Sequence, residues 1–379
     1  MTFSESPAPF AHWMLREIHE QPASLAATLT RYVNPETGSF RDEVTAPISE
    51  WLSQLRQIII AASGSSRHAG LVAELSIEDL SGIAVDVEYA SEYCYRSEKP
   101  WKDAAVVVIS QSGETADTLA ALRKAHNAGH LTLAVTNVHT STMAREATFS
   151  MPTEAGRERA IPATKSFTAQ LMVQQILALL AASAKKTLTS EALRSHLLEL
   201  VSLPTLVAEQ LAGWESSVRA VAEQYRDFRS FLFLGRGVHY AIAREGALKL
   251  KESAYLHAEG YPSGELKHGP NALVSEGTPL VMLATVDRAN PDSVQRYEKI
   301  LHLLRDMRQQ GANILAIANE GDEAVASLAT AVLTVKPASE LLLPICEVIP
   351  LQFLSYVMAI NNGIDVDRPR NLVKAVVQE

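Results

Sequence analysis

Residues 57–66, QIIIAASGSS, decide the fold class of this chain. A run of β-branched residues ends in a loop of small residues that opens a helical pattern, as in a buried strand followed by a helix. The same arrangement recurs in SFLFLGRG at 230–237. Two more strand pairs keep this order, AVVVIS at 105–110 with PLVMLAT at 279–285 and HLTLAVTN at 130–137 with ANILAIAN at 312–319. The offsets, roughly 175 to 180 residues, indicate duplication of one α/β unit.

Helical patterns separate these strands, for example over 115–128 and 293–310. The alternation predicts an α/β fold of two tandem, doubly wound (flavodoxin-like) parallel sheets, with ligands at the carboxyl ends of the strands. We expect five segments along the chain: a helical arm over 1–50, a first α/β domain over 51–188, a helical linker over 189–225, a second α/β domain over 226–363 and an irregular tail over 364–379.

The composition limits the classes of partner. The chain has 379 residues, which suits two domains, and a formal net charge of -9 with acids and bases scattered along it. Scattered negative charge argues against nucleic acid or an anionic membrane surface as a partner. An anionic ligand therefore needs a local site.

Several features favour a cytoplasmic location. Cys94 and Cys346 are too few for a disulfide framework, which fits a reducing compartment. The N-terminus lacks a basic region followed by an apolar run, so we expect no secretory signal. The most apolar stretch, 167–184, contains three glutamines and is better interpreted as a buried helix than as a membrane span.

The stretch SQSGET at 110–115 lies between a predicted strand and a helix. Hydroxyls and backbone N–H groups at a helix N-terminus form a phosphate site, because the unpaired donors and the helix dipole favour an anion. Ser66, in the loop after the neighbouring strand, adds a hydroxyl. Capping of the helix explains only one or two of these hydroxyls. The matching stretch TVDRAN at 285–290 has one hydroxyl and an acid. We therefore expect the anion site in the first half.

Cofactor motifs are not visible in the sequence. Neither ASGSSR at 62–67 nor GRG at 235–237 completes a dinucleotide fingerprint, and no Walker A motif occurs. There is no HExxH motif, and His19 and Glu20 stand alone. We expect neither a nucleotide cofactor nor a metal.

Titratable residues of the second half and the tail allow two interpretations each. Lys249 and Glu252, in the helical stretch EGALKLKE at 245–252, also fit a solvated face with i, i+3 pairing. His268 lies in a loop bounded by Gly and Pro, and a His with a pKa near neutrality suits general acid–base catalysis. Lys374, alone in the tail, also fits a surface charge.

Five separated stretches carry a resemblance to a known family. They are MLREIHEQP at 14–22, ISQSGETADT at 109–118, EGALKLKE at 245–252, HAEGYPSGELKHGP at 257–270 and DVDRPRNLVKAVVQE at 365–379. Together they resemble the isomerase part of glucosamine-6-phosphate synthase, which has two sugar-isomerase (SIS) domains. The resemblance extends from about residue 10 to the C-terminus, in the family's order.

The resemblance implies a sugar-phosphate site. The residues that match the family's contacts to the phosphate and hydroxyls of fructose or glucosamine 6-phosphate are Ser66, Ser110, Gln111, Ser112 and Thr115. Ile161 matches an apolar residue whose backbone contacts the sugar. Ala163 departs from the family, which usually has Ser there, and the lost hydrogen bond is expected to change sugar preference or affinity.

The resemblance also implies catalytic roles. Glu252 resembles the base that moves a proton between C1 and C2, with Lys249 assisting. His268 resembles the ring-opening residue, which in the family comes from the neighbouring subunit of a homodimer. Lys374 resembles the tail lysine that forms an imine with the open-chain ketose, since a desolvated amine adds to carbonyls. No cofactor is implied.

The leading hypothesis is an amino-sugar-phosphate deaminase/isomerase that interconverts glucosamine 6-phosphate with fructose 6-phosphate plus ammonia. Residues 1–10 lead almost directly into the isomerase arm without the family's glutaminase domain, so we expect free ammonia or a separate donor. The alternatives are an ammonia-dependent synthase, a deglycase for sugar–amino-acid 6-phosphates, and a non-catalytic phosphosugar sensor. A sensor has no need of Glu252, His268 and Lys374 together, which favours catalysis.

Overall fold

The computed structural model of the protein describes residues 6–97 and 103–376. The chain divides into two compact units, and each is described by itself. The first-sheet unit comprises Glu20–Glu158, Lys165–Pro204 and Val373–Glu379. The second-sheet unit comprises Met1–His19, Arg159–Thr164 and Thr205–Leu372. Each compact unit gathers stretches that lie far apart in the sequence, so this division does not test the five continuous segments that we expect. Those segments stay a prediction.

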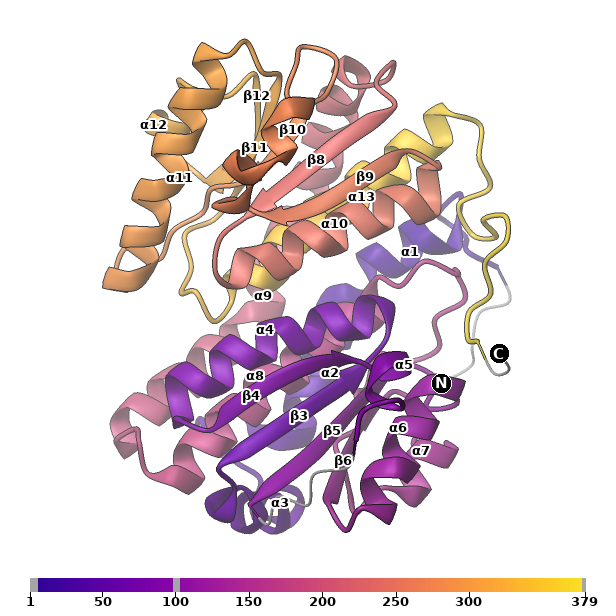
Figure 1. The fold of residues 1–379 in the computed structure, drawn as a ribbon, viewed down its shortest axis with the longest axis vertical. Coiled ribbons are helices and arrows are strands. Elements are labelled where there is room, and N and C mark those ends of the chain that lie inside the picture. Colours follow the sequence, from indigo (N-terminus) through magenta and orange to yellow (C-terminus); the bar gives the residue numbers. More distant parts are fainter. Residues whose placement is uncertain (1–5, 98–102, 377–379) are drawn as a thin grey trace. The chain divides into compact units, whose positions relative to one another are not determined.

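The first-sheet unit contains a parallel five-stranded sheet. Its strands are β3 (Gln57–Ala62), β4 (Ala84–Tyr89), β5 (Ala104–Ser110), β6 (Leu131–Thr136) and β7 (Phe149–Ser150). The spatial order is β4-β3-β5-β6-β7, with every neighbouring pair parallel (Figure 1). In chain order this is the 2-1-3-4-5 winding of a flavodoxin-like sheet. The predicted fold is confirmed here.

The second-sheet unit repeats this winding. Its strands are β8 (Ser230–Gly235), β9 (His257–Pro262), β10 (Leu280–Leu283), β11 (Ile314–Asn319) and β12 (Ala331–Val335). They lie in the order β12-β11-β10-β8-β9, again all parallel. The three strand pairs predicted from the sequence repeat occupy equivalent places in the two sheets.

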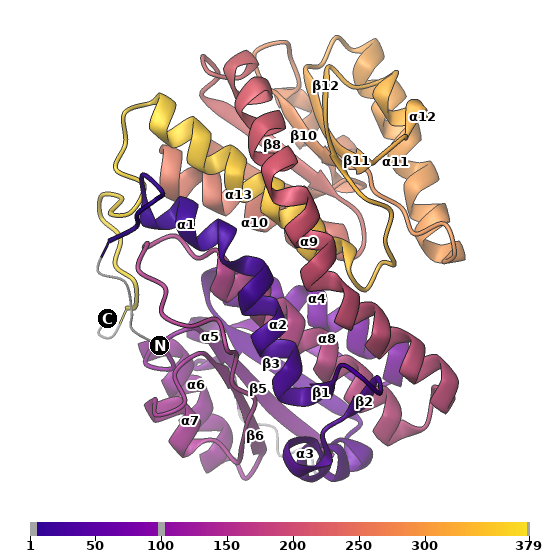
Figure 2. The same ribbon diagram turned by 180° about the vertical axis from the view of Figure 1, so that it is seen from behind.

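Helices connect and cover the strands. Those of the first-sheet unit are α2 (Gln21–Tyr32), α3 (Asp42–Gln54), α4 (Gly64–Ser81), α5 (Ala90–Tyr93), α6 (Ala116–Asn127), α7 (Thr142–Glu146) and α8 (Lys165–Lys185), with the hairpin β1 (Val33–Asn34) and β2 (Ser39–Phe40). Those of the second-sheet unit are α1 (Trp13–His19), α10 (Val238–Ala254), α11 (Pro291–Gln309), α12 (Glu323–Ala326) and α13 (Leu343–Asn361), with 3-10 turns η1 (Glu265–His268) and η2 (Pro270–Leu273). A single helix, α9 (Ser190–Gln224), spans the region where several linking helices were expected (Figure 2).

Side chains of the first sheet alternate between two helical layers. Ala61 belongs to a buried cluster with Leu122 of α6. Ile60, the preceding residue, meets α4, where a Cβ added to Gly70 would lie 2.9 Å from the Ile60 side chain. Since neighbours along a strand point to opposite faces, α4 and α6 cover opposite faces of the sheet.

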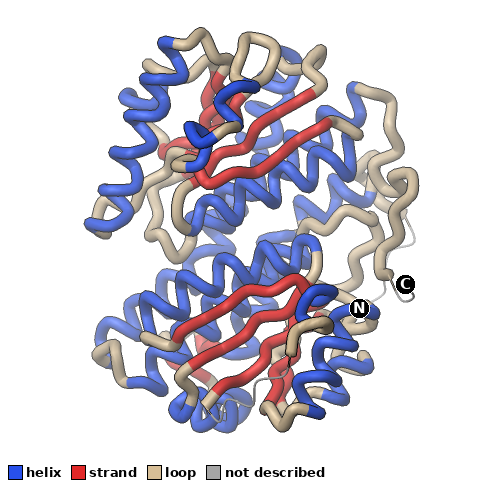
Figure 3. Tube along the Cα trace, viewed as in Figure 1, coloured by secondary structure: helices blue, strands red, loops and turns tan. Residues whose placement is uncertain are grey.

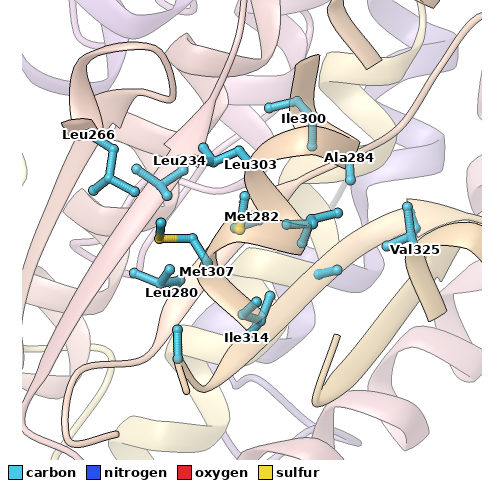
Figure 4. Packing of buried hydrophobic residues seen from close by; sticks show 14 of the residues in the cluster. Leu234, Leu266, Leu280, Met282, Ala284, Ile300, Leu303, Met307, Ile314 and Val325 are labelled. Atoms are coloured by element: carbon cyan, nitrogen blue, oxygen red, sulfur yellow. The ribbon is translucent and has the colours of Figure 1, made fainter. Parts of the chain in front are cut away.

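The core of the second sheet is built in the same way. Figure 4 shows Leu234, Met282 and Ile314 from neighbouring strands packed with Ile300, Leu303 and Met307 of α11. Phe233, adjacent to Leu234, lies against Gly246 of α10 on the other face. The apolar positions predicted in α11 are therefore core residues.

Two helices, α8 and α13, are long and apolar enough to cross a membrane. In α8, 89% of the apolar window is buried inside the protein, and in α13 94% is buried. Burial of this extent is what a core helix of an α/β unit requires, as predicted for 167–184.

The tail after α13 has no helix or strand up to residue 376, where the described part ends (Figure 3). Asp367 caps α1, because its carboxylate accepts hydrogen bonds from the N–H groups of Trp13 and Met14 at 2.8 Å. Its main-chain oxygen accepts the N–H of Ile161 at 3.1 Å. Two of the five resembling stretches therefore meet within the second-sheet unit.

Candidate active site

The strand order places a topological switch point in the first-sheet unit. β3 and β5 are neighbours, and the helices that follow them cover opposite faces of the sheet. At such a switch point the two following loops diverge and leave a crevice beyond the carboxyl ends of the strands. Residues 110–115 span the loop after β5, whereas Ser66 lies in the first turn of α4 and not in the loop where the sequence placed it.

Hydroxyl groups gather in the loop after β5. The Oγ of Ser110 lies 2.9 Å from Oγ1 of Thr115 and 3.5 Å from Oγ of Ser112. The N–H of Gly113 donates to Ser110 Oγ at 3.2 Å, and the N–H of Glu114 donates to Ser112 Oγ at 3.2 Å. Three of the predicted hydroxyls therefore form one cluster beside the N-terminus of α6. We call residues 110–115 the hydroxyl loop.

A glycine gives the hydroxyl loop its shape. Gly113 has φ +66°, in the left-handed region, and an added Cβ would lie 2.1 Å from Ser141 Oγ. Thr115 holds the N-cap position of α6, but its hydroxyl contacts Ser110 and makes no capping bond among the described residues. Helix capping by Thr115 is therefore not what gathers these hydroxyls.

Two further predicted contacts border the hydroxyl loop. Ser66 Oγ accepts a hydrogen bond from Gln170 Nε2 of α8 at 3.1 Å. The main-chain oxygen of Gln111 accepts the N–H of Asn137 at 3.1 Å, which ties the loop to the end of β6. Both side chains are partly exposed.

The tail lysine lies in the same unit as the hydroxyl loop. Lys374 Nζ is 2.5 Å from Oε2 of Glu158, and the Lys374 side chain is 26% exposed. Two residues later, the main-chain oxygen of Val376 accepts the N–H of Ala116, in the first turn of α6, at 3.0 Å. The tail therefore contacts the helix that begins at the hydroxyl loop.

Glu158 was not singled out in the sequence. Its side chain is fully buried and accepts the N–H of Ser166 at 3.1 Å and the Ser166 hydroxyl at 2.6 Å. Its partner Lys374 is 216 residues away along the chain. No local pattern signals such a pair.

The candidate base lies on α10 in the second-sheet unit. Lys249, only 1% exposed, lies 2.5 Å from Glu252 Oε2 and 3.5 Å from Glu245 Oε1. The solvated-face interpretation fits the exposed Lys251 but not Lys249. Glu245, fully buried, is a second residue that the sequence reasoning missed. Its position four residues before Lys249 was the available signal.

His268 and the segment 159–164 also belong to the second-sheet unit. His268 is exposed at the end of η1. The segment that carries Ile161 and Ala163 is held by Glu17 of α1, whose carboxylate accepts the N–H of Arg159 at 2.5 Å. Together with Asp367, Glu17 fixes the backbone on which both predicted sugar contacts lie.

The SIS domain family matches residues 51–180 and 224–362 of this chain. The chain belongs to the SIS-domain family.

A relative from Chlorobaculum tepidum, named glutamine–fructose-6-phosphate aminotransferase (isomerizing), is 43% identical over 98% of this chain. One from Aquifex aeolicus with the same name is 42% identical over 98%. The chain spans 59% and 58% of the length of these relatives. The solved C-terminal domain of glucosamine-fructose-6-phosphate aminotransferase from Francisella tularensis has a TM-score of 0.88 and 35% identity, covering 96% of this chain and all of that one.

These matches confirm the predicted resemblance and the two tandem SIS domains. The first SIS match contains the hydroxyl loop, and the second contains Glu252 and His268. Lys374 lies beyond the second match, in the tail.

The second SIS domain has different chemistry at the equivalent edge. Thr285, which follows β10, donates its hydroxyl hydrogen bond to Glu347 of α13. His239 Nδ1 lies 2.8 Å from Glu347 Oε1, and His239 Nε2 lies 3.5 Å from Glu340 Oε1. Arg296 pairs with Glu340. We call these five residues the charged cluster.

Electrostatics of the charged cluster favour the ionised forms. Burial opposes protonation of His239, but the carboxylates of Glu347 and Glu340 outweigh it and raise the pKa of His239 to about 9. Burial likewise opposes ionisation of Glu340, and the His239 and Arg296 partners still hold its pKa below the usual range. Thr285, in the stretch that corresponds to the hydroxyl loop, is therefore bonded to a member of these ion pairs and not to neighbouring hydroxyls.

Within residues 6–97 and 103–376, no group of three or more His, Cys, Asp or Glu side chains is arranged to hold a metal ion. The groups that do gather are hydroxyls, lysines and carboxylates. Such groups suit anion binding, amine chemistry and proton transfer.

Proposed function

We propose that this chain is a phosphosugar isomerase that interconverts glucosamine 6-phosphate with fructose 6-phosphate plus ammonia. The observation that carries the proposal is the contact of Lys374 with Glu158 in the unit that also holds the hydroxyl loop. A lysine serving only as a surface charge has no need of a buried partner. A lysine that forms an imine needs a defined position beside the bound sugar.

Sugar binding is assigned to the hydroxyl loop. The phosphate accepts hydrogen bonds from Ser110, Ser112 and Thr115 and is favoured by the dipole of α6. Gln111 and Ser66 contact the rest of the sugar phosphate. Ile161 offers a backbone contact, and Ala163 lacks the hydroxyl that is usual in the family.

The chemical steps are assigned to three groups. His268 opens the sugar ring, and the Lys374 amine adds to the C2 carbonyl with loss of water to form an imine. Ammonia replaces the lysine at C2, and Glu252 moves a proton from C1 to C2, with Lys249 orienting its carboxylate. The same groups act in reverse during deamination. The relatives' name describes amino transfer to fructose 6-phosphate, and this supports the aminating direction as a second candidate function.

A homodimer is part of the proposal. His268 is exposed on its turn, which leaves it available to the active site of a second copy. We propose that each site takes His268 from one subunit and Glu252 from the other, in a cytoplasmic enzyme that needs no membrane or nucleic-acid partner.

Two assays test the reaction directly. Incubation with glucosamine 6-phosphate is expected to release ammonia and fructose 6-phosphate in equal amounts, and fructose 6-phosphate with an ammonium salt is expected to give glucosamine 6-phosphate. Lys374→Ala should abolish both reactions, whereas Lys336→Ala, which removes an exposed lysine paired with Glu209, should not. Wild-type chain that turns over neither sugar, or full activity after Lys374→Ala, excludes the proposal.

Subunit complementation tests the homodimer. His268→Ala and Glu252→Gln are each expected to be inactive, and mixed dimers of the two should regain activity at one site. Inactive mixed dimers, verified by mass, would exclude a shared site.

A further inference from the structure

The strongest unassigned feature is the buried carboxylate beside the tail lysine. Glu158 is fully buried, and its Oε2 is 2.5 Å from Lys374 Nζ. The hydroxyl of Ser166 donates to the same oxygen at 2.6 Å, and the Ser166 N–H donates to Oε1 at 3.1 Å. Burying a carboxylate is costly unless it is paired and hydrogen-bonded. Ser166 supplies hydrogen bonds to this carboxylate, and the Lys374 ammonium supplies a paired charge.

The ionised form of Glu158 has a second source of stabilisation. Ser166 is the second residue of α8, so the carboxylate accepts a bond from the first turn of a helix of 21 residues. The helix dipole favours an anion at this end. Glu158 is therefore a preorganised acceptor in direct contact with the Lys374 ammonium.

We infer that Glu158 carries the proton for imine formation at Lys374, taking it from the ammonium and returning it to the departing hydroxyl. The inference rests on the proposed function and adds a residue to its mechanism. It assigns Glu158 a role distinct from that of Glu252, which pairs with Lys249 and is assigned to the carbon-bound proton.

The chemistry explains why such a group is needed. An ammonium has no lone pair, and at pH 7 only about one free lysine in 10³ is neutral, given its ordinary pKa of about 10.4. A carboxylate in direct contact removes the proton without waiting for solvent.

The step is balanced in four events. The Lys374 ammonium gives a proton to Glu158, and the neutral amine adds to the C2 carbonyl carbon. The added nitrogen passes a proton to the C2 oxygen, which gives a neutral carbinolamine. The Glu158 carboxylic acid then protonates the C2 hydroxyl, which leaves as water while the nitrogen lone pair forms the C=N bond. The products are a protonated imine, one water and a carboxylate in its original state.

The alternative is that Glu158 only anchors the tail. An anchor would change the amount of correctly placed lysine by the same factor at every pH. A proton acceptor becomes dispensable at high pH, because hydroxide in the solvent then removes the proton from the ammonium. The pH profile of imine formation therefore separates the two roles.

The experiment traps the imine in the full chain. Protein is mixed with fructose 6-phosphate and sodium cyanoborohydride, and reduced adduct on the Lys374 peptide is followed by mass spectrometry from pH 5.5 to 9.5. Glu158→Gln keeps the shape of the side chain without its basicity, and Glu158→Asp keeps the basicity. Glu154→Gln is the matched control, since Glu154 lies on the same segment but is 31% exposed and paired with Arg31 at 2.8 Å.

Wild-type protein and Glu154→Gln are expected to trap sugar at equal rates. Glu158→Gln should trap about 10²- to 10⁴-fold more slowly at pH 7 and should rise about tenfold per pH unit toward the wild-type rate. Glu158→Asp should keep the wild-type profile at a reduced rate. Affinity for fructose 6-phosphate should stay within a few-fold of wild type in all variants.

Four results would overturn the inference or the function beneath it. Equal rates for Glu158→Gln and wild type at every pH remove the proton role and leave the proposed function intact. A uniform decrease at every pH, with faster hydrogen exchange in the tail, makes Glu158 an anchor only. If Glu158→Gln does not fold, a Glu158→Asp trapping rate that rises about tenfold per pH unit also refutes the inference. No adduct on wild-type Lys374 refutes the proposed function itself.

Discussion

At the end of β5 the chain gathers the hydroxyls of Ser110, Ser112 and Thr115, whereas at the equivalent end of β10 Thr285 donates its hydroxyl to the buried Glu347. The two sheets share one winding and place these loops at the same switch point. At the first edge Ser112 and Thr115 are partly exposed beside the buried Ser110, and the second edge holds ion pairs of its own. The two domains thus share the switch point and differ in the side chains that lie beside it.

The comparison also separates binding from stability. A side chain in the hydroxyl loop has polar partners that a ligand can replace, so its loss should weaken binding more than folding. A side chain in the charged cluster has buried charges as partners, so its loss should weaken folding of that unit. Each prediction below tests one side of this division.

The largest effect is expected from His239→Ala in the charged cluster. The substitution leaves the fully buried Glu347 carboxylate without its cation, which should cost the second-sheet unit about 3–5 kcal/mol. Hydrogen exchange read by mass spectrometry should accelerate in peptides from β8 and β10 but not in those from β3 and β5. Adding Glu347→Gln should recover part of the loss. Equal acceleration in both sheets would contradict the division.

A change of pH should give the next largest effect. The carboxylates around His239 raise its pKa from 6.5, the value of an unperturbed histidine, to about 9. The folded protein therefore binds this proton more tightly than the unfolded chain does. The resulting stabilisation is complete below pH 6.5 and is lost as the pH rises through about 9. At about 1.4 kcal/mol per pKa unit, the loss is about 3 kcal/mol. The free energies of unfolding of wild type and His239→Ala, measured in urea, should converge at high pH. A difference that does not change with pH would contradict this assignment.

A smaller effect, on binding, is expected from Ser112→Ala in the hydroxyl loop. Loss of a hydrogen bond to a charged phosphate should weaken binding of fructose 6-phosphate by about 10- to 100-fold, corresponding to about 1.5–3 kcal/mol. Calorimetric titration measures this change. Thr285→Val, the equivalent substitution in the second domain, should leave the affinity unchanged. A similar loss of affinity in both variants would mean that the second edge also takes part in binding.

The smallest effect is expected from Ala163→Ser, which restores the hydroxyl usual in the family. One neutral hydrogen bond should tighten binding of fructose 6-phosphate by about two- to tenfold, or about 0.5–1.5 kcal/mol. The same titration measures it, and exchange in both sheets should stay unchanged. Weaker binding would show that the position has no room for a hydroxyl, since Ala163 is already partly buried.

Much of the fold was predictable because burial leaves a local signature. Strands covered on both faces are continuous apolar runs, and the runs at 57–62 and 105–110 were therefore readable as β3 and β5. The hydroxyl loop was readable as well, because its residues are contiguous and adjoin a helix. The single helix α9 was harder to predict, since Pro204 lies inside it and Pro ordinarily ends a helix.

Parts of the candidate site were not predictable from local patterns. Glu158 and Lys374 are 216 residues apart, and the pair forms only because the tail returns to the first-sheet unit. The burial of Lys249 depends on the elements that cover α10, so the local sequence around Lys249 by itself also fits a solvated face. The charged cluster likewise joins residues from a helix start, a strand end and α13.

The sequence alone determined the duplicated α/β winding and the place of the hydroxyl loop, because hydrophobic periodicity and contiguous polar residues act within a few residues of each other. The tertiary structure alone decided which carboxylate meets Lys374 and which of the two equivalent edges is occupied by ion pairs. The physical reason is the separation along the chain of the residues that interact. Backbone conformation responds to near neighbours, whereas the energy of a buried charge depends on partners that only the folded chain brings within about 3 Å.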